Sequence, residues 1–282
     1  MVSKDKDIKP GIPASIEIDG RFLYGAPAAG LSMEGDVALK PTRSREEFKG
    51  YQFGLADEEA QEETRVPLEN LDVLDDQGKA TIAVDLPELP STTQFLEAKV
   101  VVRLKEAGGR AVERDLVLPV NSGTEMIGIK PEFEGDLQEN SIAKFHVIAL
   151  DADGRKEAMT GLKWKLVSVE RNYQWNRDGS SWRYEPITTT RDVNSGNIDV
   201  TPEGVTVQAP VTWGRYRLEV ESLANNGPTS SVEFDAGWYV AAASTETPDG
   251  LEIALDKENY KVGDVARLVE DLLGYGAQQF RQ

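Results

Sequence analysis

Apolar and polar residues alternate along much of the chain in short runs, which clusters of Gly, Pro, Asp and Asn separate at fairly regular intervals. Segments 15–18, 79–84, 144–148 and 215–220 show this pattern. Alternation with a period of two is typical of strands that bury one face. Since few long helical patterns lie between them, the strands need antiparallel neighbours joined by hairpins. We therefore predict an all-β protein built of stacked antiparallel β-sandwiches.

One hairpin is predicted around a turn at 178–179, where Asp-Gly is a favoured two-residue loop. In this register Trp175 lies opposite Trp182 and Tyr173 opposite Tyr184, so that the four aromatic residues share one face. A flat aromatic face of this kind can stack sugars, and it is the candidate ligand-binding face of the chain. Packing against the opposite sheet or a neighbouring module is the favoured interpretation, because aromatic side chains dominate core and interface energetics.

A second hairpin is predicted around the two glycines at 108–109. A two-residue loop would set Leu104 opposite Glu113, which is a poor pair. A three-residue loop with a Gly bulge sets Lys105 opposite Glu113 instead, and the pairs that follow are of opposite charge or both apolar. The sequence therefore predicts a loop of odd length.

A weak internal repeat indicates how the chain is divided. Three segments share a short apolar start, a turn that contains Gly and a strand that enters a hairpin: 8–39, 127–150 and 251–268. A repeat of about 120 residues is too long for a solenoid and is typical of a string of similar globular modules. We predict one sandwich at 8–120 and another at 121–242. Residues 243–282 would form a linker and the truncated start of a next module.

The last residues depart from the strand pattern. Apolar residues recur there at helical spacing: Val265, Leu268, Val269, Leu272 and Leu273. Asp264 can cap the start of such a helix and Gly274 can end it. The pattern predicts a short amphipathic C-terminal helix, with a frayed tail as the alternative.

Composition then excludes several classes of function. The 282 residues, 39% of them hydrophobic, suffice for about two domains that each bury a core. The 31 Lys and Arg residues against 49 Asp and Glu give a net charge of −18, which disfavours nucleic acid and anionic membranes as partners. A charged N-terminus and the lack of a long apolar run predict neither a signal peptide nor a membrane span. With no Cys and one His, we expect no disulfide, no metal and no cofactor.

Two acidic turns resemble the start of a calcium loop. Asp151-Ala152-Asp153-Gly154 lacks the later Glu that an EF-hand requires, and 75–78 has the same character. Hairpin turns are the favoured interpretation of both, since Asp and Gly supply that turn chemistry themselves. The acidic stretch 57–63 is predicted to be a solvated loop or short turn, with a cation or partner site as the alternative.

No catalytic motif is recognisable in the chain. His146 alternates with apolar neighbours on a predicted strand, and without a second His or a Cys we expect a structural role for it. Carboxylate pairs suited to glycosidase chemistry cannot be identified from sequence spacing. We therefore expect that the chain is not an enzyme.

Six separated segments, in order along the chain, resemble bacterial alpha-2-macroglobulins. They are LYGAPAAG at 23–30, EGDVAL at 34–39, YQFGLADE at 51–58, VIALDADGR at 147–155, WRYEPITTTR at 182–191 and LDKENYKVGD at 255–264. The resemblance covers about residues 8–268. It implies a pair of central macroglobulin domains, each a fibronectin-like β-sandwich, from a longer chain.

The resemblance also implies a function. Members of this family trap proteases after cleavage of a bait segment, and many use a Cys–Gln thioester. Because this chain has no Cys, it cannot hold the thioester, and no residue matches the bait. The expected role is a non-catalytic scaffold in a periplasmic, lipoprotein-type inhibitor whose partners are neighbouring domains and proteases. The alternative is a tandem-sandwich adhesin or carbohydrate-binding module that uses the Trp175 and Trp182 face.

Overall fold

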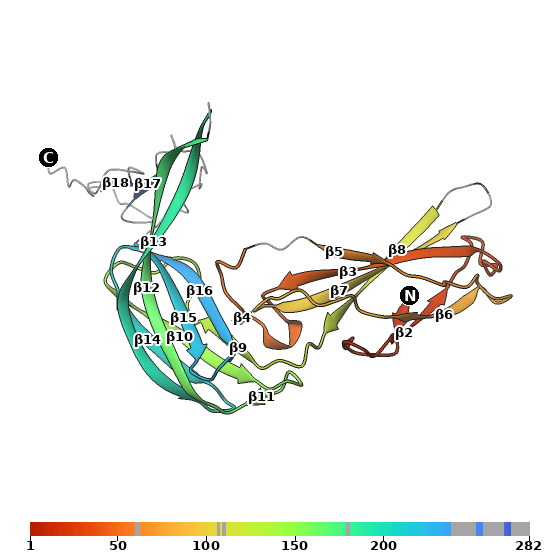
Figure 1. Ribbon diagram of the computed structural model, residues 1–282. Coiled ribbons are helices and arrows are strands. Elements are labelled where there is room, and N and C mark those ends of the chain that lie inside the picture. The colour runs from red at the N-terminus through yellow and green to blue at the C-terminus, as the bar shows by residue number, and fades with distance from the viewer. Residues whose placement is uncertain are drawn as a thin grey trace, which may run out of the picture. The chain divides into compact units, whose positions relative to one another are not determined.

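The computed structural model describes the chain in two compact units, and each is considered by itself (Figure 1). One comprises Met1–Gly128 and Ala149–Glu157, and the other Ile129–Ile148 and Ala158–Gln282. Not described are 60–62, 106–107, 109–110, 179–180, 238–251, 256–267 and 272–282. At 171–178, 181–187, 252–255 and 268–271 the backbone alone is described.

Regular structure in the described residues is β-strand, apart from the single 3-10 turn η1 (Glu46–Phe48). The paired strands of the sheets are antiparallel. The prediction of an all-β, antiparallel fold is therefore confirmed.

The first unit is a sandwich of two sheets (Figure 1). One sheet has the order β1-β2-β6, with β1 at Val2–Ser3, β2 at Ala14–Asp19 and β6 at Lys79–Val84. The other has the order β5-β3-β7-β8, with β5 at Thr64–Pro67, β3 at Ser32–Thr42, β7 at Phe95–Lys105 and β8 at Ala111–Val120. A two-residue strand, β4, lies at Gln52–Phe53.

Alternation along these strands builds the core between the sheets. On β2, Ile16 and Ile18 are buried while Glu17 and Asp19 are exposed. Ile16 and Ile18 belong to one cluster with buried side chains of β3 and β7, such as Val100. Burial of each large apolar side chain stabilises the fold by about 1.5–3 kcal/mol. The apolar face of each strand is therefore the one that points inward.

The second unit also places two sheets around an apolar core (Figure 1). In one, β10 (Ser141–Leu150) pairs with β9 (Met126–Pro131) and β14 (Val205–Val211). The short strand β11 (Lys156–Glu157) pairs with Ala149 and Leu150 at the end of β10, and these residues are counted with the first unit. The other has the order β13-β12-β15-β16, with β13 at Ser181–Val200, β12 at Met159–Asp178, β15 at Gly214–Ser222 and β16 at Thr229–Ala236. Aromatic rings meet between the sheets, where Phe145 of β10 lies 5.1 Å from Phe234 of β16.

The register predicted for the β12–β13 hairpin is wrong by two residues. The last pair is Asp178 with Ser181, so Trp175 lies opposite Tyr184 rather than Trp182. Only residues 179–180 separate the two strands in the sequence. A shift by two residues leaves the same side chains on each face, so the apolar pattern alone does not determine this register.

The β7–β8 hairpin confirms the odd loop length but not the predicted pairs. Lys105 lies opposite Ala111 rather than the predicted Glu113, Leu104 lies opposite Val112, and five residues separate the strand ends. Glu113 pairs with Arg103, and the two side chains form an ion pair at 2.7 Å. A shift by two residues keeps the same faces in contact, so both registers satisfy the alternation and both offer pairs of opposite charge.

The predicted C-terminal helix is wrong where that segment is described. Leu268–Asp271 is strand β18, which pairs with β17 at Glu252–Leu255. Leu268 lies opposite Leu255 and Val269 opposite Ala254. Short apolar runs fit either period, and here strand pairing overrides the helical spacing.

Candidate functional site

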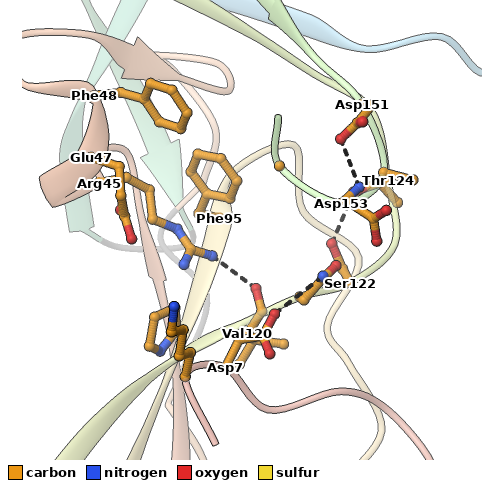
Figure 2. Close-up of a pocket in the computed structure, with 15 residues that line it drawn as sticks. Asp7, Arg45, Glu47, Phe48, Phe95, Val120, Ser122, Thr124, Asp151 and Asp153 are labelled. Atoms are coloured by element: carbon orange, nitrogen blue, oxygen red, sulfur yellow. Dashed lines mark hydrogen bonds between the residues drawn. The ribbon is translucent and has the colours of Figure 1, made fainter. Parts of the chain in front are cut away.

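A cavity of about 290 Å³ lies beside Arg45, and its lining residues all belong to the first unit (Figure 2). The Arg45 Nη2 donates a hydrogen bond of 2.8 Å to the backbone oxygen of Val120, at the end of β8. The guanidinium carbon lies 4.3 Å from the centre of the Phe95 ring, which is a cation–π contact. Figure 2 shows this side chain running beside Phe95 toward Val120. Arg45 thereby joins the loop before η1 to the ends of β7 and β8.

The surroundings of Arg45 indicate a structural role for this residue. Burial lowers the pKa of Arg45, while the carboxylates of Glu47, Glu97 and Asp7 oppose that shift. Its Nε is buried and has no hydrogen-bond partner among the described residues. A guanidinium that is packed on an aromatic ring and bonded to backbone holds the chain in place, and its buried Nε is closed to a ligand.

Several other polar groups of the cavity are also bonded to the protein. The Asn121 side-chain amide donates to Asp7 at 3.2 Å, and the hydroxyls of Ser122 and Thr124 lie 2.9 Å apart. Asp151 uses its carboxylate within its own turn. The cavity is therefore best explained as a junction that anchors the end of β8.

The two Asp–Gly segments form the same turn. The turn at 151–154 joins β10 to β11, which confirms the hairpin predicted there, whereas the turn at 75–78 leads into β6 from residues that are not a strand. Asp75 Oδ1 accepts hydrogen bonds from the backbone nitrogens of Gln77 and Lys79, both at 2.8 Å. Asp151 Oδ1 accepts the equivalent bonds from Asp153 and Arg155 at 2.9 and 2.8 Å. Each carboxylate closes its own loop. In the described part of the chain, no group of three or more acidic or His side chains is placed to hold a metal ion.

One member of the predicted acidic stretch has a specific structural role. The Glu58 carboxylate accepts a hydrogen bond of 2.9 Å from the Thr93 backbone nitrogen and another from the Thr93 hydroxyl. The same hydroxyl accepts a bond of 2.8 Å from the Leu55 nitrogen. Burial alone would raise the pKa of Glu58, but hydrogen bonds from Thr92 and Thr93 and the charge of Arg43 lower it below its usual 4.5. Glu58 thus fastens the loop after β4 to the segment before β7, whereas Asp57 and Glu59 are exposed.

We expect Glu58→Gln to weaken the acid sensitivity of the first unit. The folded-state pKa of Glu58 is lower than the unfolded one, so the carboxylate stabilises the fold fully above the unfolded pKa. That stabilisation is lost as the pH falls through the folded pKa. Urea unfolding of wild type and Glu58→Gln at a series of pH values below 4.5 measures the difference.

The matched control for this pH test is Glu59→Gln, which removes one negative charge from an exposed position one residue along. Its use separates the hydrogen-bonded role of Glu58 from the general effect of charge on a protein of net charge −18. Identical acid profiles for Glu58→Gln and wild type would contradict the assignment.

His146 lies in β10 opposite Thr206, on a half-buried position. Its ring packs against Gly204, where an added Cβ would come within 2.2 Å of the imidazole Cε1. This close approach needs a glycine, which also has a left-handed φ of +100°. His146, the one histidine of the chain, therefore packs against Gly204.

The aromatic residues Tyr173, Trp175, Trp182 and Tyr184 occupy the part of β12 and β13 that is described by its backbone alone. Their side chains lie outside the described set. The packing and ligand-binding interpretations of this face therefore both stay predictions.

Sequence analysis missed Arg45 and Glu58 as structural anchors. Residues 45, 95 and 120 are far apart in the chain, and nothing in their local pattern signals that they meet. Glu58 stands among six similar acidic or amide residues at 57–63, so its neighbours hide it. Among the described residues, no helix is long and apolar enough to cross a membrane.

Comparison with known families gives two matches in order along the chain. Residues 1–121 match the family described as Bacterial Alpha-2-macroglobulin MG5 domain. Residues 128–238 match the family described as Bacterial macroglobulin domain 6. Both matches fall on the segments that form the sandwiches.

Individual relatives agree with these matches. Alpha-2-macroglobulin of Escherichia coli strain K12 is 30% identical over 290 residues, which cover 95% of this chain and 17% of the relative. The solved native conformation of the E. coli protein has a TM-score of 0.66 and 28% identity, over 95% of this chain and 18% of that one. The E. coli protein activated by porcine elastase has a TM-score of 0.63 and 29% identity, over 90% and 22%. The chain thus spans less than a quarter of the length of each of these relatives.

Proposed function

This chain belongs to the bacterial alpha-2-macroglobulin family, and from that premise we propose that it is a scaffold segment of a protease-trapping inhibitor. The observation that carries the proposal is the match of two consecutive macroglobulin domains, in order, to the two sandwiches. The solved E. coli relative activated by porcine elastase supports proteases as the targets of the whole protein. The proposal assigns no catalysis to this segment.

Physical features of the segment support a scaffold role. The half-buried polar groups of Arg45 and Glu58 bond to backbone and fasten loops to strand ends. On the outer face of the first unit, Arg103 contacts Asp36 at 2.6 Å and Glu113 at 2.7 Å, which ties β3, β7 and β8 together. These contacts link loops and strands of the first unit, which supports a segment that positions other domains.

We expect the 282-residue chain alone to leave protease activity unchanged, and the full-length protein that contains it to inhibit. Elastase or trypsin is incubated with each protein at equimolar ratio, and residual cleavage of a protein substrate is measured. Stoichiometric inhibition by the chain alone would overturn the scaffold assignment. A full-length protein that neither inhibits nor binds the protease would overturn the trap assignment.

We also propose that the full-length protein is periplasmic. The proposal rests on the resemblance to bacterial alpha-2-macroglobulins alone. Fractionation of cells that express the full-length gene, with detection of this segment by antibody, tests it. Recovery in the cytoplasmic fraction would refute it.

A further inference from the structure

The loop that joins β2 to β3 carries two exposed apolar side chains at its tip. Leu23 is fully exposed, and Tyr24 is 79% exposed. The Tyr24 ring stacks on Phe22, with 5.3 Å between ring centres and 1° between ring planes. Phe22 in turn packs against the core of the first unit. Phe22 therefore anchors the tip of the loop to the core, while Leu23 extends into solvent.

Backbone hydrogen bonds close this loop. The Phe22 nitrogen donates to the Ala26 oxygen at 2.9 Å, and the Gly25 nitrogen donates to the Phe22 oxygen at 2.8 Å. Gly25 has a φ of +91°, which the turn requires and which other residues rarely adopt. A loop that is already ordered loses little entropy when it binds, so this tip is well suited to insert into a partner.

Two more exposed apolar residues lie at the same end of the unit. A Cβ on Gly20 would lie 2.6 Å from Leu74 and 3.1 Å from Leu104, so these three positions meet. Val73 precedes Leu74 and is 57% exposed. Val112 lies opposite Leu104 in the sheet and is 38% exposed.

We call these four exposed residues the distal patch: Leu23, Tyr24, Val73 and Val112. The patch lies at the end of the sheet where Lys105 of β7 pairs with Ala111. The chain leaves the first unit at the other end, where Leu96 pairs with Val120. Nine residues of strand between Leu96 and Lys105 correspond to about 30 Å, so the patch is remote from that exit.

Two basic side chains near the distal patch already have partners. Arg21 donates to Asp19 at 3.0 and 3.3 Å, and Lys105 forms an ion pair with Glu34. Single exposed apolar side chains are common on protein surfaces. An aromatic residue and a fully exposed Leu on a closed loop, at the same end of the unit as two exposed Val residues, fit an apolar pocket on another protein surface.

The N-terminal strand indicates which surface that is. β1 pairs with β2 so that Val2 lies opposite Glu17, and the next step of this register brings Met1 beside Ile18. Ile18 is one residue from the end of β2 at Asp19, where the loop to the distal patch begins. Residues that precede Met1 in the full-length protein would therefore enter at the distal end.

We propose that the distal patch docks against the domain that directly precedes this segment in the full-length alpha-2-macroglobulin. The inference rests on the proposed function, since it requires the longer chain. The matching families are macroglobulin domains five and six, and the chain spans 17% of the E. coli relative. The domain numbered four is therefore the one that would precede this segment and meet the distal patch. Leu23 inserts into an apolar pocket of that domain, and Tyr24 covers its edge.

A photo-crosslinking residue at position 23 of the full-length protein tests this contact. We expect Leu23→p-benzoylphenylalanine to crosslink within the same chain to a peptide from the preceding domain, identified by mass spectrometry. The same replacement at Leu223, which is exposed in the second unit, is the control and should give no crosslink to that domain. Crosslinks from position 23 only to later domains, only to other molecules or to nothing would overturn the proposal.

Thiol accessibility supplies an independent measurement. Leu23→Cys and Leu223→Cys each introduce one thiol into a segment that has none, and labelling is read on the peptide that holds the new residue. In the full-length protein we expect labelling at position 23 to be about tenfold or more slower than in the 282-residue chain, because the thiol reacts only when the contact opens. Equal rates at position 23 in the two proteins would overturn the proposal.

These outcomes separate the docking contact from the proposed function. A full-length protein that inhibits proteases but fails both tests at position 23 refutes the docking contact alone. A full-length protein that does not inhibit refutes the proposed function, whatever position 23 contacts.

Discussion

Replacement of Phe145 by Ala is expected to lower the free energy of unfolding of the second unit by about 3–5 kcal/mol. Phe145 lies on β10, is fully buried and is one of the largest side chains of the core. Its loss removes apolar surface from the core and leaves a cavity that the surrounding sheets can fill only in part.

The rings around Phe145 explain why this position should be among the most sensitive. Phe145 lies 5.5 Å from Phe133 and 5.1 Å from Phe234, measured between ring centres. Phe234 also stacks on Tyr216, at 5.6 Å. Phe145 therefore joins β10 of one sheet to β15 and β16 of the other, and edge-to-face rings add about 0.5–1.5 kcal/mol beyond their buried area.

Tryptophan fluorescence during urea unfolding measures this change selectively. All five Trp residues lie at position 164 or later, so their emission follows the second unit. Ile142→Ala on the same strand is the matched control, because Ile142 is 56% exposed and its truncation should change stability by no more than about 0.5 kcal/mol. Equal midpoints for Phe145→Ala and Ile142→Ala would contradict the assignment of this core.

The second large effect is expected at Gly78, where Ala should lower the free energy of unfolding of the first unit by about 2–4 kcal/mol. Gly78 has a φ of +72°, which strains any residue with a side chain. An added Cβ would also lie 2.4 Å from the backbone oxygen of Gly20 and 2.9 Å from the backbone nitrogen of Ala28. Backbone atoms cannot move aside as a flexible side chain can, so the loop from β2 must shift.

Gly154 provides a matched control in the same type of turn. Gly154 closes the turn of Asp151 as Gly78 closes that of Asp75. In both turns the glycine backbone nitrogen donates a hydrogen bond of 2.9 Å to the backbone oxygen of the Asp. The φ of Gly154 is +78°, but an added Cβ would meet nothing within 4 Å. Gly154→Ala should therefore cost only about 1 kcal/mol, the price of the left-handed backbone alone.

Far-UV circular dichroism during urea unfolding measures both glycine variants, with Trp emission marking the transition of the second unit. The difference between them isolates the steric contact of Gly78 from the shared backbone strain. If Gly78→Ala destabilises no more than Gly154→Ala, the close approach to Gly20 and Ala28 is not present in solution.

Much of the fold follows from the apolar pattern. Ile16 and Ile18 on β2, and Phe145 and Val147 on β10, alternate with polar residues because each strand buries one face. The two Asp–Gly turns were also predictable, because the Asp carboxylate and the Gly backbone conformation are local chemistry. The strand at Leu268–Asp271 was not, since short apolar runs fit helix and strand alike and pairing with β17 decides.

Hairpin register was predictable only to within two residues. In the β7–β8 hairpin, apolar residues face each other whether Val100 lies opposite Leu116 or Leu118, and the structure has Leu116. Shifts of one residue would reverse the faces and are excluded by the pattern, whereas shifts of two are not. Contacts from a third strand help to choose, since Arg103 also contacts Asp36 of β3.

The sequence by itself determined an all-β chain of antiparallel strands, the local turns and the resemblance to a family, because periodicity and turn chemistry act over a few residues. Only the tertiary structure decided which similar residues have distinct roles. It selected Glu58 from an acidic run, Arg45 from many basic residues and Leu23 from many apolar ones. Such roles depend on groups that meet in space from distant positions, and a burial pattern along the chain carries no record of which distant neighbours a side chain will have.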